Sequence, residues 1–283
     1  MQPTPDDPRP PRSVRVHLPL AHPRWTYIFL IINGVLFVAM LIAGLTQSTN
    51  LQDAFRHLGR VLQGDSNLLI DFGANFAEYV AAGQYWRLIT ANFLHVGIVH
   101  LLFNSYALYG LGIQVEAVYG HRRFVTLYVL SGISGAIFSY IFTHGLSAGA
   151  STSLFGLFAA LVVFFFKQRK LLGATGQQQL IRLGVTLAAN VYLGLSPGSR
   201  IDNWGHVGGF VGGLILAWFF CPRYERANPF FHAFEPIIRP EHKPELRNDE
   251  IMDANSLASQ KWVVGMFVVG LITLTTLGTL WYQ

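Results

Sequence analysis

The chain has 283 residues, of which 52% are apolar and only 12% are charged, and its formal net charge is +5. A soluble domain carries about 25% charged residues, so this chain has too few charged groups to cover a globular surface. That excludes a disordered chain and an ordinary cytosolic enzyme. The single cysteine, Cys221, excludes an intramolecular disulfide and a cysteine-built metal site. The composition therefore predicts a membrane protein.

Seven apolar runs are long enough, or nearly so, to cross a hydrocarbon core of about 30 Å, which takes roughly 17–25 helical residues. The fifth run is short and carries Arg182, whose long side chain can reach the membrane interface. The alternating short segments of a membrane β-barrel are absent. The sequence predicts an all-α bundle with seven spans: Trp25–Leu45, Ile98–Val115, Phe124–Phe142, Gly149–Phe166, Leu180–Leu195, Trp204–Cys221 and Trp262–Trp281.

Basic residues are divided unevenly between the two sides of these spans. Sixteen of the 20 Lys and Arg residues precede the first span or lie in the connections that share its side. Cytoplasmic connections carry an excess of Lys and Arg, so the amino terminus is predicted to be cytoplasmic and the carboxy terminus to lie outside. We therefore expect a multi-pass protein of the cell membrane.

The segments outside the spans differ in composition. Residues 1–24 are rich in proline and lack an apolar signal-peptide core, which predicts a disordered cytoplasmic tail. Residues 25–221 form a six-helix core, and residues 222–261 form a polar cytoplasmic linker to a seventh helix at 262–283. The outer loop, residues 46–97, is too interrupted to cross the bilayer, and is either a small cap or a segment in the interface.

Polar side chains inside spans are costly unless they are paired or functional. His100 and Asn104 are four residues apart and share one helix face, with His95 shortly before them. Ser151, His206 and Asn104 each lie about 21–24 Å above the inner end of their helix at ~1.5 Å per residue. Interhelical hydrogen bonding would explain any one of them, whereas the common depth of all three favours a shared site.

Glycines predict which helices touch. Gly149 and Gly156 in the fourth span, and Gly209 and Gly213 in the sixth, remove side chains from one face of each helix. Small residues along one helix face allow the backbones of membrane helices to approach closely. We therefore expect the fourth and sixth spans to be in direct contact.

That contact predicts a specific chemistry. It would bring the Ser151 hydroxyl within reach of His206, and a serine activated by a histidine is a nucleophile with its general base. An acyl-transfer transition state also needs donors for its oxyanion. The Ser151 backbone N–H, His100 and Asn104 are candidates for these donors. The groups required for peptide hydrolysis are thus expected at one depth.

The sequence predicts different roles for Ser151, Ser153 and Asp202. Ser151 shares a helix face with Phe155, whose ring is placed to pack under the His206 imidazole. Ser153 points to another face and is expected to hydrogen-bond its own helix backbone. Asp202 lies four residues before His206, where a carboxylate is expected to cap the sixth helix.

These residues resemble the rhomboid family of intramembrane serine proteases. The resemblance covers residues 86–213, in the order of the family and on the expected helices. It rests on the loop pair Trp86-Arg87, the run His95, His100 and Asn104, the pair Gly112-x3-Glu116, the segment Gly149-Ala-Ser151-Thr152, and the signature from Gly205-His206 through Gly209 to Gly213.

The resemblance implies a catalytic dyad without an aspartate. Ser151 would be the nucleophile and His206 the general base, with His100 and Asn104 in the oxyanion hole and Phe155 stacked on the histidine. It implies no cofactor, no metal and no nucleic-acid partner. Its implied substrates are single-pass membrane proteins, cut near the outer end of their helix at small residues.

The resemblance also implies supporting roles and a layout. Trp86 and Arg87 would belong to a first loop embedded in the outer leaflet, and Glu116 would make structural hydrogen bonds near the cytoplasmic end of the second helix. A six-helix core with one carboxy-terminal helix is a common rhomboid layout. The oligomeric state is left open. Thr152 and Ser153 depart from the Gly-Ala of many relatives, and Thr152 would add bulk beside the oxyanion site.

Three other functions compete with a protease. A catalytically silent relative that binds membrane helices would typically lack the serine or the histidine. A channel or transporter would use the polar residues to line a water path, but the chain has no internal repeat. A metal site built from His95, His100 and His206 lacks a carboxylate or thiolate partner.

Overall fold

The computed structural model describes residues 20–143, 145–199, 201–226, 251–253, 255 and 257–282. It divides into two units. The larger unit, within Leu20–Pro222 and Asn255–Gln283, is helical apart from one short strand pair. In the smaller unit, strand β3 (Tyr224–Arg226) pairs antiparallel with β4 (Ile251–Asp253), with Tyr224 opposite Asp253.

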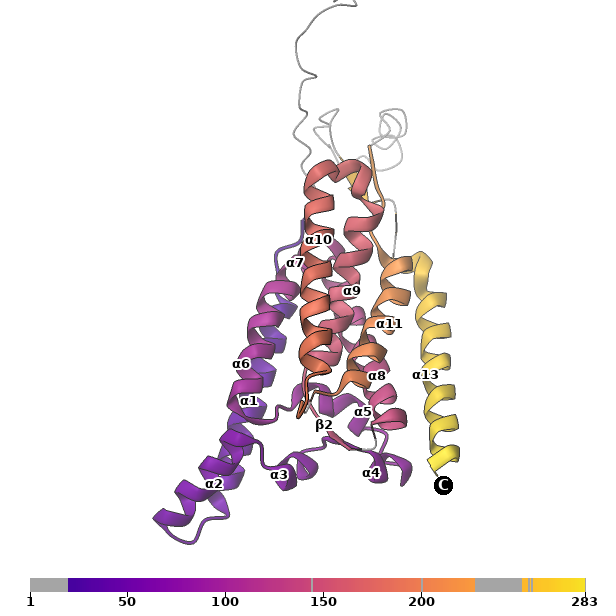
Figure 1. Cartoon of the computed structure of the whole chain (residues 1–283). Coiled ribbons are helices and arrows are strands. Elements are labelled where there is room, and N and C mark those ends of the chain that lie inside the picture. The colour runs from indigo at the N-terminus through magenta and orange to yellow at the C-terminus, as the bar shows by residue number, and fades with distance from the viewer. Residues whose placement is uncertain are drawn as a thin grey trace, which may run out of the picture. The chain divides into compact units, whose positions relative to one another are not determined.

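Each predicted apolar run lies on a long helical segment (Figure 1). The second run starts as an α-helix, passes through the π-helical turn η2 (Leu108–Gly112) and continues as an α-helix. Gly173, at φ 54°, interrupts the helix of the fifth run. The segments are α1 (Trp25–Thr46), α6 (Gly97–Ala107) with α7 (Ile113–Tyr119), α8 (His121–Phe142), α9 (Ser151–Lys167), α10 (Arg169–Gly194), α11 (Asn203–Phe220) and α13 (Lys261–Tyr282).

Four of these segments are long and apolar enough to cross a membrane: Trp25–Thr46, Gly97–Tyr119, His121–Phe142 and Ala258–Tyr282. Helix α9 is apolar but shorter. Glycines and polar residues lower the mean hydropathy of α10 and α11. A mostly helical membrane protein is therefore confirmed, while the seven-span topology and its orientation stay predictions.

The predicted tail and linker lie mostly outside the described residues. Residues 20–24, assigned to the tail, are described and contact α7, because the Ala21 N–H donates to the Ala117 carbonyl at 2.9 Å. The Asn255 amide donates to the Phe219 and Cys221 carbonyls, each at 2.8 Å, and so satisfies the carboxy-terminal end of α11.

Glu116 fixes the start of α1 against α7. Its fully buried carboxylate accepts hydrogen bonds from the backbone N–H groups of Arg24, Trp25 and Thr26 and from the Thr26 hydroxyl, at 2.8–2.9 Å. The His121 ring lies 2.7 Å away. A carboxylate at a helix start satisfies N–H groups that lack partners within the helix. The predicted structural hydrogen bonds of Glu116 are thus present.

The outer loop is folded rather than irregular. It contains α2 (Leu51–Gln63), α3 (Ser66–Asp71), β1 (Asn75–Phe76), α4 (Ala77–Ala81), α5 (Arg87–Thr90) and the 3-10 turn η1 (Ala91–Phe93). Strand β1 pairs antiparallel with β2 (Leu146–Ser147), with Asn75 opposite Ser147. The loop is therefore joined to the segment that leads into α9.

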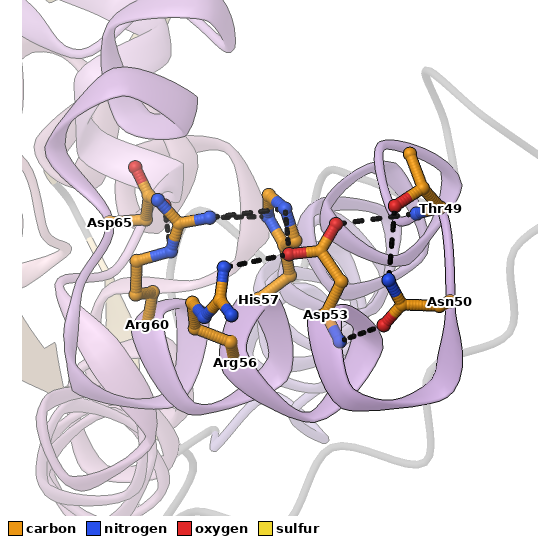
Figure 2. A network of polar contacts seen from close by, with 7 residues as sticks. All are labelled: Thr49, Asn50, Asp53, Arg56, His57, Arg60 and Asp65. Carbon is orange, nitrogen blue, oxygen red and sulfur yellow. Dashed lines mark hydrogen bonds and ion pairs between the residues drawn. The ribbon is translucent and has the colours of Figure 1, made fainter.

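Polar side chains of helix α2 and of the residues that flank it form a network of contacts (Figure 2). On the polar side, Asp53 binds Arg56 at 3.1 Å and lies near His57, and the Arg60 guanidinium contacts both His57 and Asp65. On its inner side, Val61 is buried and lies against Gly44 of α1. Leu51 and Phe55 are exposed.

We expect Glu116→Ala to destabilise the bundle. The substitution leaves several buried N–H and O–H donors without an acceptor, and hydrogen bonds to a charged group contribute about 1.5–3 kcal/mol each. The free energy of unfolding, measured in detergent, should fall by about 3 kcal/mol or more. The exposed Glu78 of α4 offers a matched control, and Glu78→Ala should change stability little. Equal stabilities of the two variants would contradict the role of Glu116.

Candidate active site

Helices α9 and α11 touch through Gly156, Gly209 and Gly213, as the sequence predicts. The prediction for Gly149 is wrong, because this glycine precedes α9 and faces α6 instead of α11. A Cβ atom added at Gly213 would lie 2.5 Å from the Gly156 Cα, and one added at Gly209 would collide with the Thr152 carbonyl oxygen. The two backbones are therefore in direct contact at two levels, one helical turn apart. Any side chain larger than hydrogen at these positions would push the helices apart.

The contact places His206 beside the start of α9. The His206 ring stacks on the Phe155 ring, with a centroid separation of 4.2 Å and an interplanar angle of 18°. Ser151 begins α9 four residues before Phe155, on the same helix face. Both Ser151 and His206 are partly exposed. Within the described residues, their side chains form no hydrogen bond with each other.

His100 and Asn104 converge on Gly149, two residues before Ser151. A Cβ atom at Gly149, where φ is +144°, would lie 3.0 Å from His100 Nε2 and 3.6 Å from Asn104 Nδ2. His100 Nδ1 accepts a hydrogen bond from the Val96 N–H at 3.3 Å, so in a neutral ring the proton is on Nε2. Asn104 Nδ2 is buried and has no partner in the described part of the chain. Two side-chain donors therefore face the segment that carries Ser151.

The start of α9 adds backbone donors. The first bond within the helix runs from the Leu154 N–H to the Ala150 carbonyl at 2.9 Å. The N–H groups of Ser151, Thr152 and Ser153 precede it and have no acceptor within the helix. They carry the partial positive charge of a helix amino terminus, which suits a developing oxyanion.

The remaining predicted residues support the loop around the site. The His95 side chain is buried, and its ring meets the His100 ring edge-on at 5.5 Å. Arg87 is 6% exposed and donates to the Ile70 carbonyl at 2.7 Å and the Ala74 carbonyl at 3.1 Å. Its guanidinium also lies 4.7 Å from the ring centroid of Trp86, which is half-exposed. Arg87 therefore holds the loop from within.

Asp202 caps α11, as predicted. Its carboxylate accepts from the Gly205 N–H at 2.9 Å. It also accepts from the Thr143 hydroxyl at 2.8 Å and the Ser147 hydroxyl at 2.6 Å. One carboxylate thus joins the end of α8, strand β2 and the start of α11, and it stays at the helix start rather than forming a third member of a triad.

Two expectations about the residues after Ser151 are wrong. Thr152 is 5% exposed and packs between Gly135 of α8 and Gly205 of α11, so its bulk fills a space between helices instead of lying beside the oxyanion site. The Ser153 hydroxyl is fully buried and, among the described residues, has no hydrogen-bond partner. It lies across from Gly132 of α8, since that glycine leaves room for it there.

One residue near the site was missed. Asn92 of η1 is buried, and its Oδ1 accepts from the Thr152 hydroxyl at 2.6 Å. A lone Asn in an apolar stretch carries no sequence signal, because its partner is 60 residues away in the chain.

A family model described as the rhomboid domain matches residues 82–223, half of the chain. The chain belongs to the rhomboid family. It is 36% identical to the rhomboid protease GluP of Bacillus subtilis (strain 168) over 195 residues, which cover 69% of this chain and 34% of GluP. It is 31% identical to RHOMBOID-like protein 7 of Arabidopsis thaliana over 212 residues, covering 70% of this chain and 67% of that protein.

A further relative is a putative rhomboid protease, YdcA of Bacillus subtilis (strain 168), which is 34% identical over 152 residues. The 152 aligned residues cover 52% of this rhomboid and 73% of YdcA. For RHOMBOID-like protein 1 of Arabidopsis thaliana, the identity is 34%, and the match spans 48% of its length. The match thus spans only about a third to a half of GluP and RHOMBOID-like protein 1.

We expect Gly209→Ala to separate α9 from α11 in this rhomboid. The added methyl group would collide with the Thr152 carbonyl, and overpacking of this kind costs about 1–3 kcal/mol. Thermal unfolding in detergent measures the loss. Gly270→Ala is the matched control, because a Cβ at Gly270 of α13 meets nothing within 4 Å. A Gly209→Ala variant as stable as the control would contradict the close contact.

Proposed function

We propose that this protein is an intramembrane serine endopeptidase that cleaves transmembrane helices of other membrane proteins. The observation that carries the proposal is the stacking of His206 on Phe155, one helical turn from Ser151, at the glycine contact between α9 and α11. A stacked imidazole has a fixed orientation, as a general base requires. The names of two relatives, rhomboid protease GluP and putative rhomboid protease YdcA, agree with this activity.

The proposed reaction proceeds through an acyl-enzyme. Ser151 Oγ attacks the carbonyl carbon of the scissile peptide bond while His206 takes the hydroxyl proton. The carbonyl oxygen becomes an oxyanion, stabilised by His100 Nε2–H, Asn104 Nδ2–H and the Ser151 backbone N–H. His206 then gives its proton to the leaving amine as the C–N bond breaks. A water molecule, deprotonated by His206, hydrolyses the resulting Ser151 ester and restores the hydroxyl.

This mechanism needs a small adjustment at the dyad. Catalytic hydrogen bonds are often long or misaligned before substrate binds, and they tighten in the enzyme–substrate complex. Ser151 and His206 are adjacent to fixed groups, since Thr152 contacts Gly209 and His206 stacks on Phe155. The mechanism therefore requires the Ser151–His206 hydrogen bond to form when substrate binds.

We further propose the membrane arrangement that the sequence predicts. The catalytic core of six spans, residues 25–221, would sit in the cell membrane with a cytoplasmic amino terminus and an outer loop at 46–97. The linker 222–261 would lead to the seventh span, residues 262–283. Substrates would be single-pass membrane proteins, cut near the outer end of their helix.

A catalytically silent, helix-binding relative is the second candidate. It would share the lipid-embedded fold but would not need the donors at Gly149 or the ring stacked on Phe155. The unpartnered Asn104 amide favours the enzyme, because a buried donor without an acceptor is costly unless it binds a ligand or intermediate.

Removal of either dyad member should abolish cleavage. We expect purified Ser151→Ala and His206→Ala proteins to fold but to leave a fluorogenic transmembrane substrate uncut, because each lacks the nucleophile or its base. Ser153→Ala, a matched serine change two residues away, should retain cleavage. A serine-directed fluorophosphonate should label Ser151 in the wild type. Cleavage by Ser151→Ala, or labelling at Ser153 alone, would overturn the assignment.

Asn104 should contribute to turnover rather than to folding. We expect Asn104→Ala to lower kcat by about 10²-fold, the usual effect of losing one oxyanion donor. Thermal stability should be retained, because Asn104 Nδ2 gives up no hydrogen bond within the described structure. Single-turnover kinetics would measure the effect. An unchanged kcat would show that Asn104 lies outside the oxyanion hole.

A further inference from the structure

Two adjacent residues of η1 hold both sides of Ser151. The Ala91 carbonyl accepts from the Gly149 N–H at 2.9 Å, two residues before the serine. Asn92 Oδ1 accepts from the Thr152 hydroxyl at 2.6 Å, one residue after it. The outer loop therefore makes two hydrogen bonds to the short segment that carries Ser151, one on each side of the serine.

The Asn92 amide has a defined orientation in this contact. Its Nδ2 donates to the Leu88 carbonyl at 2.8 Å and to the Ile89 carbonyl at 3.3 Å. Both donor hydrogens therefore point toward α5, which leaves Oδ1 as an acceptor for Thr152. Turning the amide over would set its oxygen against two carbonyl oxygens. Helix α5 is in turn fixed by the buried Arg87.

The other side of Thr152 faces α11. A Cβ atom at Gly205 would lie 3.1 Å from the Thr152 methyl group, and one at Gly209 would collide with the Thr152 carbonyl. Gly205 directly precedes His206. Thr152 thus lies between η1 and the helix that carries the general base, so its position sets the separation between Ser151 and His206.

We propose that Asn92 and Thr152 form a positioning contact that holds Ser151 in register with His206 and with the oxyanion donors. This inference rests on the proposed protease function and adds two positioning residues to it. Neither residue touches the reacting atoms. Their hydrogen bond fixes the start of α9, so that the hydroxyl, the imidazole and the donors at Gly149 share one geometry. A displacement of about 1 Å at such a site costs up to ~100-fold in rate.

Conservative variants separate positioning from folding. Thr152→Val keeps the shape of the side chain and removes the hydroxyl, whereas Thr152→Ser keeps the hydroxyl and removes the methyl group. Thr126→Val is the matched control, because the partly exposed Thr126 of α8 donates to the Arg122 carbonyl within its own helix. Each full-length protein is purified in detergent, and kcat, KM and fluorophosphonate labelling rate are measured per folded molecule.

We expect Thr152→Val to lower kcat and the labelling rate by about 10- to 100-fold, with KM within about twofold of the wild type. Thr152→Ser should restore most of kcat, and Thr126→Val should match the wild type. Asn92→Leu should behave like Thr152→Val, and the double variant should be no slower than either, because both remove the same hydrogen bond.

Different failures have different meanings. If the wild type cuts its substrate and Ser151→Ala does not, but Thr152→Val has wild-type kcat per folded molecule, the positioning role is wrong and the protease function stands. Additive losses in the double variant, or a Thr152→Ser variant as slow as Thr152→Val, would also overturn the positioning contact. A wild type that labels at Ser151 with no cleavage of any membrane helix would instead overturn the proposed function.

Discussion

The direct backbone contact between α9 and α11 is the constraint on which the rest of this structure depends. Gly156 and Gly213 meet without side chains between them, and Gly209 accommodates the Thr152 carbonyl. In a lipid environment, apolar surface gains little from burial against another helix, so van der Waals contact at close range does more of the work. The same contact determines the distance between the Ser151 hydroxyl on one helix and the His206 imidazole on the other. Stability and the candidate site therefore share one set of residues.

Much of this arrangement could be predicted from the sequence, because its signals are local. Apolar runs predicted the long helices, and Gly156, Gly209 and Gly213 identified the faces that touch. The four-residue interval from Ser151 to Phe155 predicted the ring beneath His206, which lies 4.2 Å away in the structure. The position of Asp202 at a helix start predicted its cap. Each of these inferences needs only helical periodicity and the chemistry of one residue.

Other features depend on contacts between distant parts of the chain. The sequence of the outer loop indicated only a segment too interrupted to cross the bilayer. In the structure, the loop contains several short helices and a strand paired with residues about 70 positions later. Thr152 was expected beside the oxyanion site, but Gly135 and Gly205 make room for it between two helices. Its bond to Asn92 joins residues 60 apart. No periodic pattern carries such pairings, because they arise only when the bundle has assembled.

Helix α2 is held by two kinds of interaction, ion pairs on one side and apolar packing against α1 on the other. The exposed guanidinium groups of Arg56 and Arg60 pair with the partly buried carboxylates of Asp53 and Asp65, and in about 1 M salt the screening length falls to about 3 Å. Ion pairs at a protein surface contribute about 1 kcal/mol or less. Val61 is buried against Gly44, and that contact is indifferent to added electrolyte. The packing of α2 against α1 should consequently persist in concentrated brine, while the side chains of Arg56 and Arg60 become more mobile.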